Sequence, residues 1–153
     1  MTEPDKQEGE LTILLVEDDD VAAEGVARSA RKFSFPCNLV WARDGLEALQ
    51  VLRGHDGKQP LSSPLIVLLD LNMPRMDGFE FLEQLRADPT LQHTVVFVLT
   101  TSNSEADIRL AYVHVVAGYL VKSQLGRGME KLGAFLSAYQ AVTQLPRHQA
   151  HGC

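Results

Sequence analysis

Short runs of apolar residues, each ending at a polar or charged side chain, alternate with amphipathic stretches along the chain. The most continuous run is Pro64 to Leu69, six apolar residues that stop at Asp70. An unbroken run of this length is typical of a strand buried on both faces, as in a parallel sheet. Ligands of open α/β sheets bind just outside the carboxyl ends of the strands. Residues 64–70 are therefore the predicted central strand, and we expect functional chemistry at Asp70.

Four other apolar runs predict the remaining strands. They are residues 11–16, 37–41, 94–99 and 119–121. Apolar residues at helical spacing lie between the strands and predict helices, whose capping residues and breakers indicate the limits. The predicted helices run from the N-cap Asp20 through Phe33 to the breaker Pro36, from Asp44-Gly45 through Leu52, from Asp77 to Asp88, from Ser104 to about Ala117, and from about Leu125 to Gln144. Residues 54–63 form a predicted polar loop.

Five strands that alternate with five helices indicate a doubly wound α/β fold with a parallel sheet. We expect a five-stranded sheet in the flavodoxin-like order 2-1-3-4-5, with helices on both faces. Residues 1–10 are polar and charged and predict a disordered N-terminal lead-in. Residues 11–145 then form one folded domain, and residues 146–153 form a C-terminal tail.

Composition narrows the classes of function. The 153 residues are 45% hydrophobic and 22% charged, as is ordinary for a soluble globular protein. A net charge of −6 argues against a nucleic-acid partner, because phosphate binding requires a basic surface. No apolar run approaches the roughly 20 residues that span a bilayer, and the first residues lack the features of a signal peptide. We therefore expect a cytoplasmic protein that binds neither nucleic acid nor membrane.

Chemically distinctive residues follow four of the predicted strands. Glu17 and Asp18 follow the first strand, Asp70 the third, Thr100 the fourth and Lys122 the fifth. In the order 2-1-3-4-5, strands one, three and four are neighbours, and strand five lies beyond strand four. The carboxyl ends of these strands would bring all five side chains around one shallow pocket.

The three carboxylates of this pocket would repel one another. Two unit charges about 4 Å apart cost about 4 kcal/mol at an effective dielectric of 20. Such a cluster takes up protons or binds a cation, and a small all-oxygen site suits Mg²⁺. A lysine beside that cation makes sense if a further anion must arrive. The set fits covalent phosphorylation of Asp70, with Mg²⁺ and Lys122 neutralising the phosphoryl charge and Thr100 donating a hydrogen bond.

Each of these residues also has a simpler explanation when taken alone. Acidic residues 17–20 precede a helix and could serve only as caps. Thr100 could be an ordinary strand-end hydroxyl, and Lys122 a solvated charge. Asp70 is harder to explain in this way, because it follows an unbroken apolar strand. The placement of every group at a strand end favours the functional interpretation.

Four spaced motifs resemble those of the receiver domain of two-component response regulators. They are Ile-Leu-Leu-Val-Glu-Asp-Asp at 13–19, Leu-Asp-Leu-Asn-Met-Pro at 69–74 with Asp77-Gly78, Leu-Thr-Thr-Ser at 99–102, and Tyr-Leu-Val-Lys at 119–122. They occur in the family's order, and the resemblance covers about residues 11 to 143. It implies a signalling protein rather than an enzyme, one that catalyses only its own phosphorylation and dephosphorylation.

The resemblance also implies a role for each motif residue. Asp70 would accept a phosphoryl group from a phosphohistidine on a sensor histidine kinase. Thr100 and Lys122 would contact the phosphoryl oxygens, and Tyr119 would be the aromatic switch that turns inward with Thr100. Mg²⁺, or Mn²⁺ in its place, would be bound by Glu17, Asp18, Asp70 and the backbone carbonyl of Asn72.

Two residues depart from the commonest family pattern, and a narrower resemblance adds a partner. Glu17 stands where Asp is usual, and Ser123 follows the lysine where the family usually has proline. Residues 99–103, the Lys122-Ser123 pair and the tail through Leu145-Pro146 are similar to response regulators paired with bacterial phytochromes. This similarity implies that a red-light-sensing bacteriophytochrome is the phosphodonor.

No DNA-binding or catalytic effector segment follows the motifs, so we expect output through the domain's own surface. The last predicted helix has two apolar stripes. The first is Leu125, Met129, Leu132, Leu136 and Tyr139, and the second is Phe135, Ala138, Val142 and Leu145. One stripe suffices to pack on the sheet, so the second predicts a homodimer surface, unless both form one broad core face. The apolar segment 110–116 suggests that the preceding helix joins this surface.

Three other functions compete with this interpretation. A phosphohydrolase with Asp70 as nucleophile would need a second acid two positions later, where this chain has Asn72. A flavin-binding module would need a phosphate cradle after the first strand, where residues 17–19 would repel the phosphate. A receiver-like adaptor that works without phosphorylation is disfavoured by the complete set of Asp70, Thr100 and Lys122.

Overall fold

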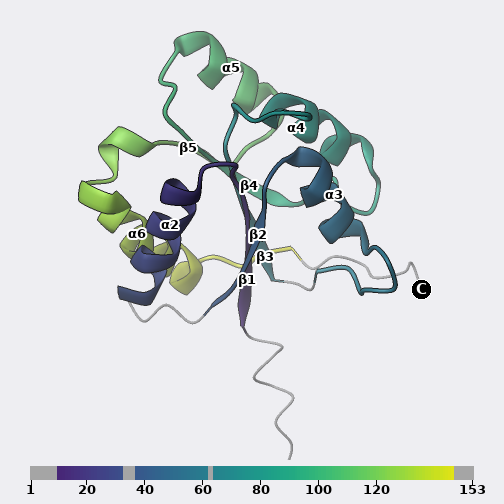
Figure 1. Cartoon of the computed structure of the whole chain (residues 1–153), viewed down its shortest axis with the longest axis horizontal. Coiled ribbons are helices and arrows are strands. Elements are labelled where there is room, and N and C mark those ends of the chain that lie inside the picture. Colours follow the sequence, from purple (N-terminus) through teal and green to yellow (C-terminus); the bar gives the residue numbers. More distant parts are fainter. Residues whose placement is uncertain (1–9, 33–36, 62–63, 147–153) are drawn as a thin grey trace, which may run out of the picture.

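A five-stranded sheet, parallel throughout, forms the centre of the protein (Figure 1). The structure is a computed structural model, and it describes residues 10–32, 37–61 and 64–146. The strands are β1 (Leu11–Val16), β2 (Cys37–Ala42), β3 (Leu65–Leu69), β4 (Val95–Thr100) and β5 (Gly118–Val121). Their order is β2-β1-β3-β4-β5, which confirms the predicted topology. Phe33, Pro36 and most of the predicted lead-in and tail lie outside the described residues.

The described part of the chain contains five α-helices, which cover both faces of the sheet (Figure 1). They are α2 (Asp20–Lys32), α3 (Gly45–Arg53), α4 (Gly78–Ala87), α5 (Glu105–Val113) and α6 (Glu130–Val142). Helices α2 and α6 pack together on one face, and α3, α4 and α5 lie on the other. None of the helices in the described ranges is long and apolar enough to cross a membrane.

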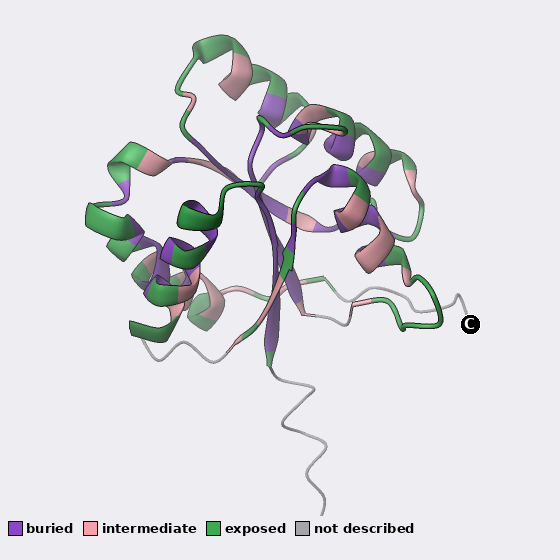
Figure 2. Ribbon diagram, in the orientation of Figure 1, coloured by how far each residue is buried: buried purple, intermediate pink, exposed green. Residues whose placement is uncertain are grey.

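Alternating side chains of the central strands supply the two halves of the core. Leu14 and Val67 pack towards α3 and α4, whereas Ile13 and Ile66 pack towards α2 and α6. All residues of β1 and β3 are buried, as Figure 2 shows. Because successive side chains of a strand point to opposite faces, only a strand covered on both faces can be apolar at every position. The prediction of a doubly covered central strand is therefore confirmed.

The first helix begins at a different acid from the one predicted. Asp20 lies within its first turn, and Asp19 caps it by accepting the Val21 N–H through Oδ1 at 3.2 Å. The carbonyl of Asp19 also accepts the N–H of Ala23 at 3.0 Å. The prediction that Asp20 is the N-cap was wrong, because four consecutive acids offer no sequence signal that separates one candidate cap from the next.

Helix α5 ends earlier than the sequence predicts. Ser104 caps its start as expected, but the helix stops at Val113 instead of continuing to Ala117. Val115 has a left-handed backbone with φ of 62°, which a helix cannot contain. The Arg86 guanidinium, from α4, donates to the carbonyls of His114 at 2.8 Å and Val115 at 2.9 Å. A side chain distant in sequence thus provides hydrogen-bond donors for the carbonyl groups just after the end of the helix.

The last helix starts later than predicted. Residues 122–124 and 127–129 form short 3₁₀ turns, η1 and η2, and α6 begins only at Glu130. The backbone is left-handed at Gly126, Gly128 and Met129, which interrupts any continuous helix from Leu125. The result is a compact connection between Lys122, at the end of β5, and α6.

Candidate functional site

Strand β1 delivers two carboxylates to the carboxyl edge of the sheet. Glu17 continues the strand pairing, since its N–H donates to the carbonyl of Ala42 at 3.0 Å, and the residue is 1% exposed. Its Oε2 accepts the Asp19 N–H at 3.2 Å, which fixes the direction of the carboxylate. Asp18, the next residue, is exposed. One carboxylate is therefore held inside the protein and the other faces solvent.

Strand β3 delivers Asp70 to the same edge. The Asp70 N–H donates to the carbonyl of Val16 at 3.0 Å, so the residue still lies within the sheet, and it is 7% exposed. Its Oδ1 lies 3.5 Å from the backbone nitrogen of Asn72. Gly78 closes the following loop, and a Cβ there would lie 2.7 Å from the carbonyl oxygen of Asp70. The glycine at the start of α4 is required because its backbone passes so close to Asp70.

Glu17, Asp18 and Asp70 form one cluster. Each offers a carboxylate oxygen, and these three oxygens lie within 4.8 Å of one another. Oxygen ligands, carboxylates above all, are the set that Mg²⁺ and Mn²⁺ accept. The residues present therefore fit a divalent cation. These three side chains therefore lie close together in the structure, as the sequence predicts.

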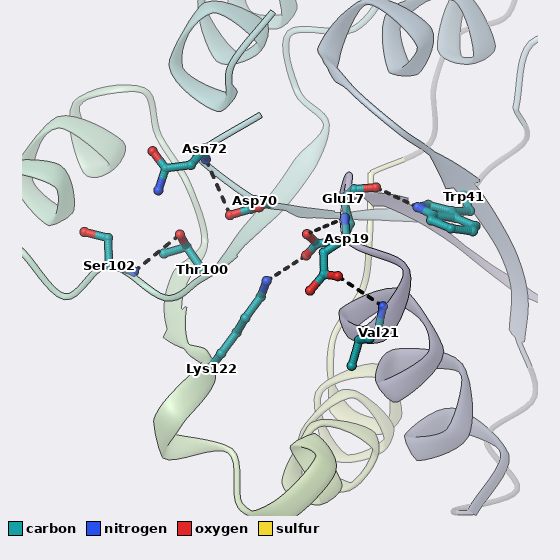
Figure 3. A network of polar contacts seen from close by, with 9 residues as sticks. All are labelled: Glu17, Asp19, Val21, Trp41, Asp70, Asn72, Thr100, Ser102 and Lys122. Atoms are coloured by element: carbon teal, nitrogen blue, oxygen red, sulfur yellow. Dashed lines mark hydrogen bonds and ion pairs between the residues drawn. The ribbon is translucent and has the colours of Figure 1, made fainter. Parts of the chain in front are cut away.

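Lys122 enters the cluster from the end of β5. Its Nζ lies 2.8 Å from Oε1 of Glu17, as Figure 3 shows. Burial raises the pKa of the Glu17 carboxyl to about 7, and the nearby Asp70 charge acts in the same direction, while the hydrogen bond from Lys122 opposes both. The lysine was predicted to face a phosphoryl group. In the structure its partner is Glu17.

Thr100 and Tyr119 lie beside the cluster on β4 and β5. Thr100 is fully buried, and its Oγ1 lies 3.5 Å from the backbone nitrogen of Ser102 (Figure 3). The Tyr119 hydroxyl donates to the carbonyl of Ser102 at 3.0 Å, and partial burial raises the pKa of that hydroxyl. Both side chains are thus connected to the start of the β4–α5 connection.

Sequence reasoning missed the contribution of β2 to this region. The Trp41 indole N–H donates to the carbonyl of Glu17 at 2.7 Å (Figure 3). Asp44 forms an ion pair with Arg75, which lies in the loop after Asp70. The chain's single tryptophan at a strand end was the one available signal, and nothing in the sequence marks the Asp44–Arg75 pair.

The predicted dimer stripe divides between the core and the surface. Phe135 packs edge-to-face on Phe97, with ring centroids 5.3 Å apart, and Leu145 also packs against the core beneath α6. Ala138 is exposed, and Val142 is 85% exposed. Phe135 and Leu145 therefore contribute to the protein's own core, and an intermolecular role for α6 would rest on Ala138 and Val142.

A comparison with protein families identifies the class of protein. The model of the response regulator receiver domain matches residues 13–147, so the chain belongs to that family. A curated relative, the probable methanogenesis regulatory protein FilR2 of Methanothrix harundinacea, is 44% identical over 110 residues, which cover 72% of this chain and 70% of FilR2. Response regulator Rcp1 of Synechocystis is 37% identical over 112 residues, 73% of this chain and 76% of Rcp1.

Solved structures of similar fold include response regulators of phytochrome signalling. The phosphorylated cyanobacterial phytochrome response regulator RcpA aligns with a TM-score of 0.77 and 31% identity, over 90% of this chain and 99% of RcpA. The Mn²⁺-bound form of Rcp1 aligns with a TM-score of 0.76 and 32% identity, over 88% and 98% of the two chains. The bacteriophytochrome response regulator RtBRR aligns with a TM-score of 0.71 and 28% identity, over 88% and 80%. The family is one of signalling proteins rather than metabolic enzymes.

Proposed function

We propose that this protein is a phosphorylation-dependent response regulator that accepts a phosphoryl group on Asp70 from the phosphohistidine of a sensor histidine kinase. The carboxylate cluster of Glu17, Asp18 and Asp70, with oxygens within 4.8 Å of one another, carries the proposal. Carboxylates this close together repel one another, and a bound divalent cation would neutralise that repulsion. Membership of the receiver family supports the same conclusion.

The proposed transfer is a displacement at phosphorus. An Oδ atom of Asp70 forms the new O–P bond while the P–N bond of the donor breaks, and the electron pair of that bond remains with the donor imidazole. Lys122 would turn from Glu17 to the phosphoryl oxygens, and Thr100 would donate its hydroxyl hydrogen to one of them. A pocket of about 500 Å³ opens beside Lys122, between α2 and the turn before α6.

Mg²⁺, or Mn²⁺ in its place, is the cofactor that these residues would hold. Glu17, Asp18, Asp70 and the backbone carbonyl of Asn72 would be its ligands. The cation neutralises charge on the transferred group when it is bound. The Mn²⁺-bound structure of Rcp1 supports this choice of metal.

A bacteriophytochrome is the kinase partner that we propose. Two of the solved structures above are named as phytochrome or bacteriophytochrome response regulators. FilR2 is named for methanogenesis, so identity alone does not select the partner. The pairing would be supported if the rate of phosphotransfer from a bacteriophytochrome kinase to this protein differed between red and far-red light. We also propose a cytoplasmic location, because the kinase makes its phosphohistidine from cellular ATP.

The proposed output is a change at the protein's own surface. We propose a homodimer formed through the last two helices, where several large apolar side chains are exposed. They are Leu110, Tyr112, Val113, Val115 and Val142. Tyr119, whose hydroxyl donates to the carbonyl of Ser102 shortly before α5, would transmit the change as the aromatic switch.

The test is direct phosphorylation by a small donor. The protein would be incubated with Mg²⁺ and acetyl phosphate and analysed by intact-mass spectrometry. We expect an adduct of about 80 Da that is stable in mild acid and labile in base. The Asp70→Asn variant, which lacks the nucleophile, should show none. A folded parent protein without the adduct would instead point to a phosphorylation-independent adaptor.

A further inference from the structure

The end of β2 and the turn that follows it contact both loops that carry the proposed metal ligands. The end of β2 holds Glu17: the carbonyl of Ala42 accepts the Glu17 N–H at 3.0 Å, and the Trp41 indole donates to the Glu17 carbonyl at 2.7 Å. The residue that carries the buried ligand therefore receives a backbone and a side-chain contact from the end of this strand.

The turn itself holds the loop after Asp70. The Nε and Nη2 atoms of Arg75 each lie 2.6 Å from Oδ2 of Asp44. The N–H of Gly45 donates to the carbonyl of Met76 at 3.2 Å. Arg75 has a left-handed backbone with φ of 65°, an uncommon conformation for a residue other than glycine. Its side chain thus helps to hold the loop in a shape that the backbone alone disfavours.

Asp44 is the centre of this connection. Its side chain is 7% exposed, whereas that of Arg75 is 62% exposed. The Oδ1 atom of Asp44 accepts the N–H of Glu47 at 2.9 Å and caps α3, which leaves Oδ2 for Arg75. Gly45 permits the close contact, because a Cβ there would lie 2.8 Å from Cγ of Met76. Both oxygens of Asp44 are therefore engaged, one by the start of α3 and the other by Arg75.

We propose that Asp44 and Arg75 are positioning residues that set the distance between the two ligand-bearing loops. The pair binds no metal itself. It connects the loop of Asp70 and Asn72 to the turn directly after the strand end that holds Glu17, so that ligands from both strands can reach one cation. This inference rests on the proposed cation site, and it predicts that the pair affects metal affinity from a distance.

The test measures Mg²⁺ affinity by isothermal titration calorimetry, without any phosphodonor. Asp44→Asn keeps an oxygen to cap α3 and replaces the charged oxygen that holds Arg75 with an amide NH2. Arg75→Gln removes the other partner. Groups that orient metal ligands change affinity by about 10- to 100-fold when removed, and we expect about tenfold weaker binding in both variants. Arg75→Lys, which keeps one charged donor, should recover part of the loss.

A simple effect of charge predicts a different pattern. Loss of the positive Arg75 would then tighten Mg²⁺ binding, and loss of the negative Asp44 would weaken it. Weaker binding in both variants therefore separates positioning from general electrostatics. Tighter or unchanged binding in Arg75→Gln would overturn the proposal.

A matched ion pair far from the site supplies the control. Arg53 donates through Nε to Oδ2 of Asp88 at 3.0 Å, between the C-terminal ends of α3 and α4. Arg53→Gln should leave the Mg²⁺ affinity unchanged. Urea unfolding would confirm that all variants are folded under the titration conditions, and faster amide exchange of residues 71–77 in Asp44→Asn and Arg75→Gln, but not in Arg53→Gln, would show the loosened loop. If the parent protein binds no Mg²⁺, the proposed cation site itself fails, an outcome distinct from equal binding by parent and variants.

Discussion

Lys122 and Glu17 form a buried ion pair between the ends of β5 and β1, with 2.8 Å between Nζ and Oε1. Their side chains are 16% and 2% exposed. Removing one member of such a pair leaves an uncompensated charge, which is costly in a buried setting. The proposed function gives both residues a second partner, a cation for Glu17 and a phosphoryl group for Lys122. Activation would therefore exchange one set of charge contacts for another.

Mg²⁺ affinity should depend on pH near neutrality. Burial and the Asp70 charge raise the pKa of Glu17 to about 7, although the Lys122 hydrogen bond opposes them. A proton and a cation compete for the same carboxylate, so affinity falls as the carboxylate becomes protonated. We expect about tenfold weaker binding at about pH 6 than at about pH 8, measured by calorimetry. Glu17→Gln should bind weakly at both values, and an equal pH dependence in that variant would contradict the assignment.

The same group should affect stability in the opposite direction when no Mg²⁺ is present. The pKa of Glu17 is higher in the folded state than its ordinary value of 4.5, so between about pH 4.5 and pH 7 the folded protein binds more protons than the unfolded chain. The free energy of unfolding therefore falls as pH rises through this range, by up to about 3 kcal/mol. Urea unfolding at several pH values would measure the slope, which Glu17→Gln should flatten.

Lys122 should matter for phosphorylation more than for cation binding. Removal of a charged donor that stabilises developing negative charge costs about 10²- to 10³-fold in rate. We expect Lys122→Gln to slow phosphorylation by acetyl phosphate to this extent, because nothing then replaces its charge at the phosphoryl group. Rates from intact-mass time courses at saturating Mg²⁺ would measure the effect. The matched control is Lys32→Gln, an exposed lysine paired with Glu130, which should keep the parental rate.

The sequence predicted the structure best where residues close together in the chain determine the local structure. Continuous apolar runs predicted β1 and β3, and Asp77 predicted the start of α4, where it accepts the Glu80 N–H at 2.9 Å. Strand ends then placed Asp70, Thr100 and Lys122 near one another, because parallel strands share one carboxyl edge. That prediction needed no knowledge of how the helices pack.

The sequence was least informative where a distant partner decides the outcome. Helix α5 stops where the Arg86 guanidinium donates to the carbonyls of His114 and Val115, and nothing in the sequence near residue 114 indicates that contact. Phe135 has the spacing of a second surface stripe, yet Phe97 and Tyr139 surround it in the core. The partner of Arg75 likewise lies 31 residues away. Helical spacing shows which residues share a face, but not how wide the buried face is.

Ser29 should contribute to stability through the start of α6. The N-cap residue of that helix, Met129, makes no side-chain cap hydrogen bond among the described residues. Instead the buried Ser29 hydroxyl, from α2, accepts the N–H of Gly133 at 2.8 Å. Ser29→Ala leaves this donor without its partner, and we expect a loss of about 1–3 kcal/mol in urea unfolding. Ser137→Ala, on α6 itself, should change stability by less than about 0.5 kcal/mol.

Dimerisation should depend on the exposed apolar face of α5. Val113, the last residue of that helix, is 72% exposed, and its neighbour Tyr112 is 50% exposed. Apolar groups gathered on a surface favour association. A charge at their centre opposes association, because the charged group would lose its water on burial in the interface. We expect Val113→Asp to weaken self-association by more than about tenfold in analytical ultracentrifugation, a difference of about 1.4 kcal/mol.

Val21, an equally exposed valine on α2 at 79%, provides the matched control Val21→Asp, which should remain dimeric. A parent protein that sediments as a monomer at tens of micromolar, with or without phosphorylation, would refute the dimer, whereas loss of dimer in both variants would place the interface elsewhere.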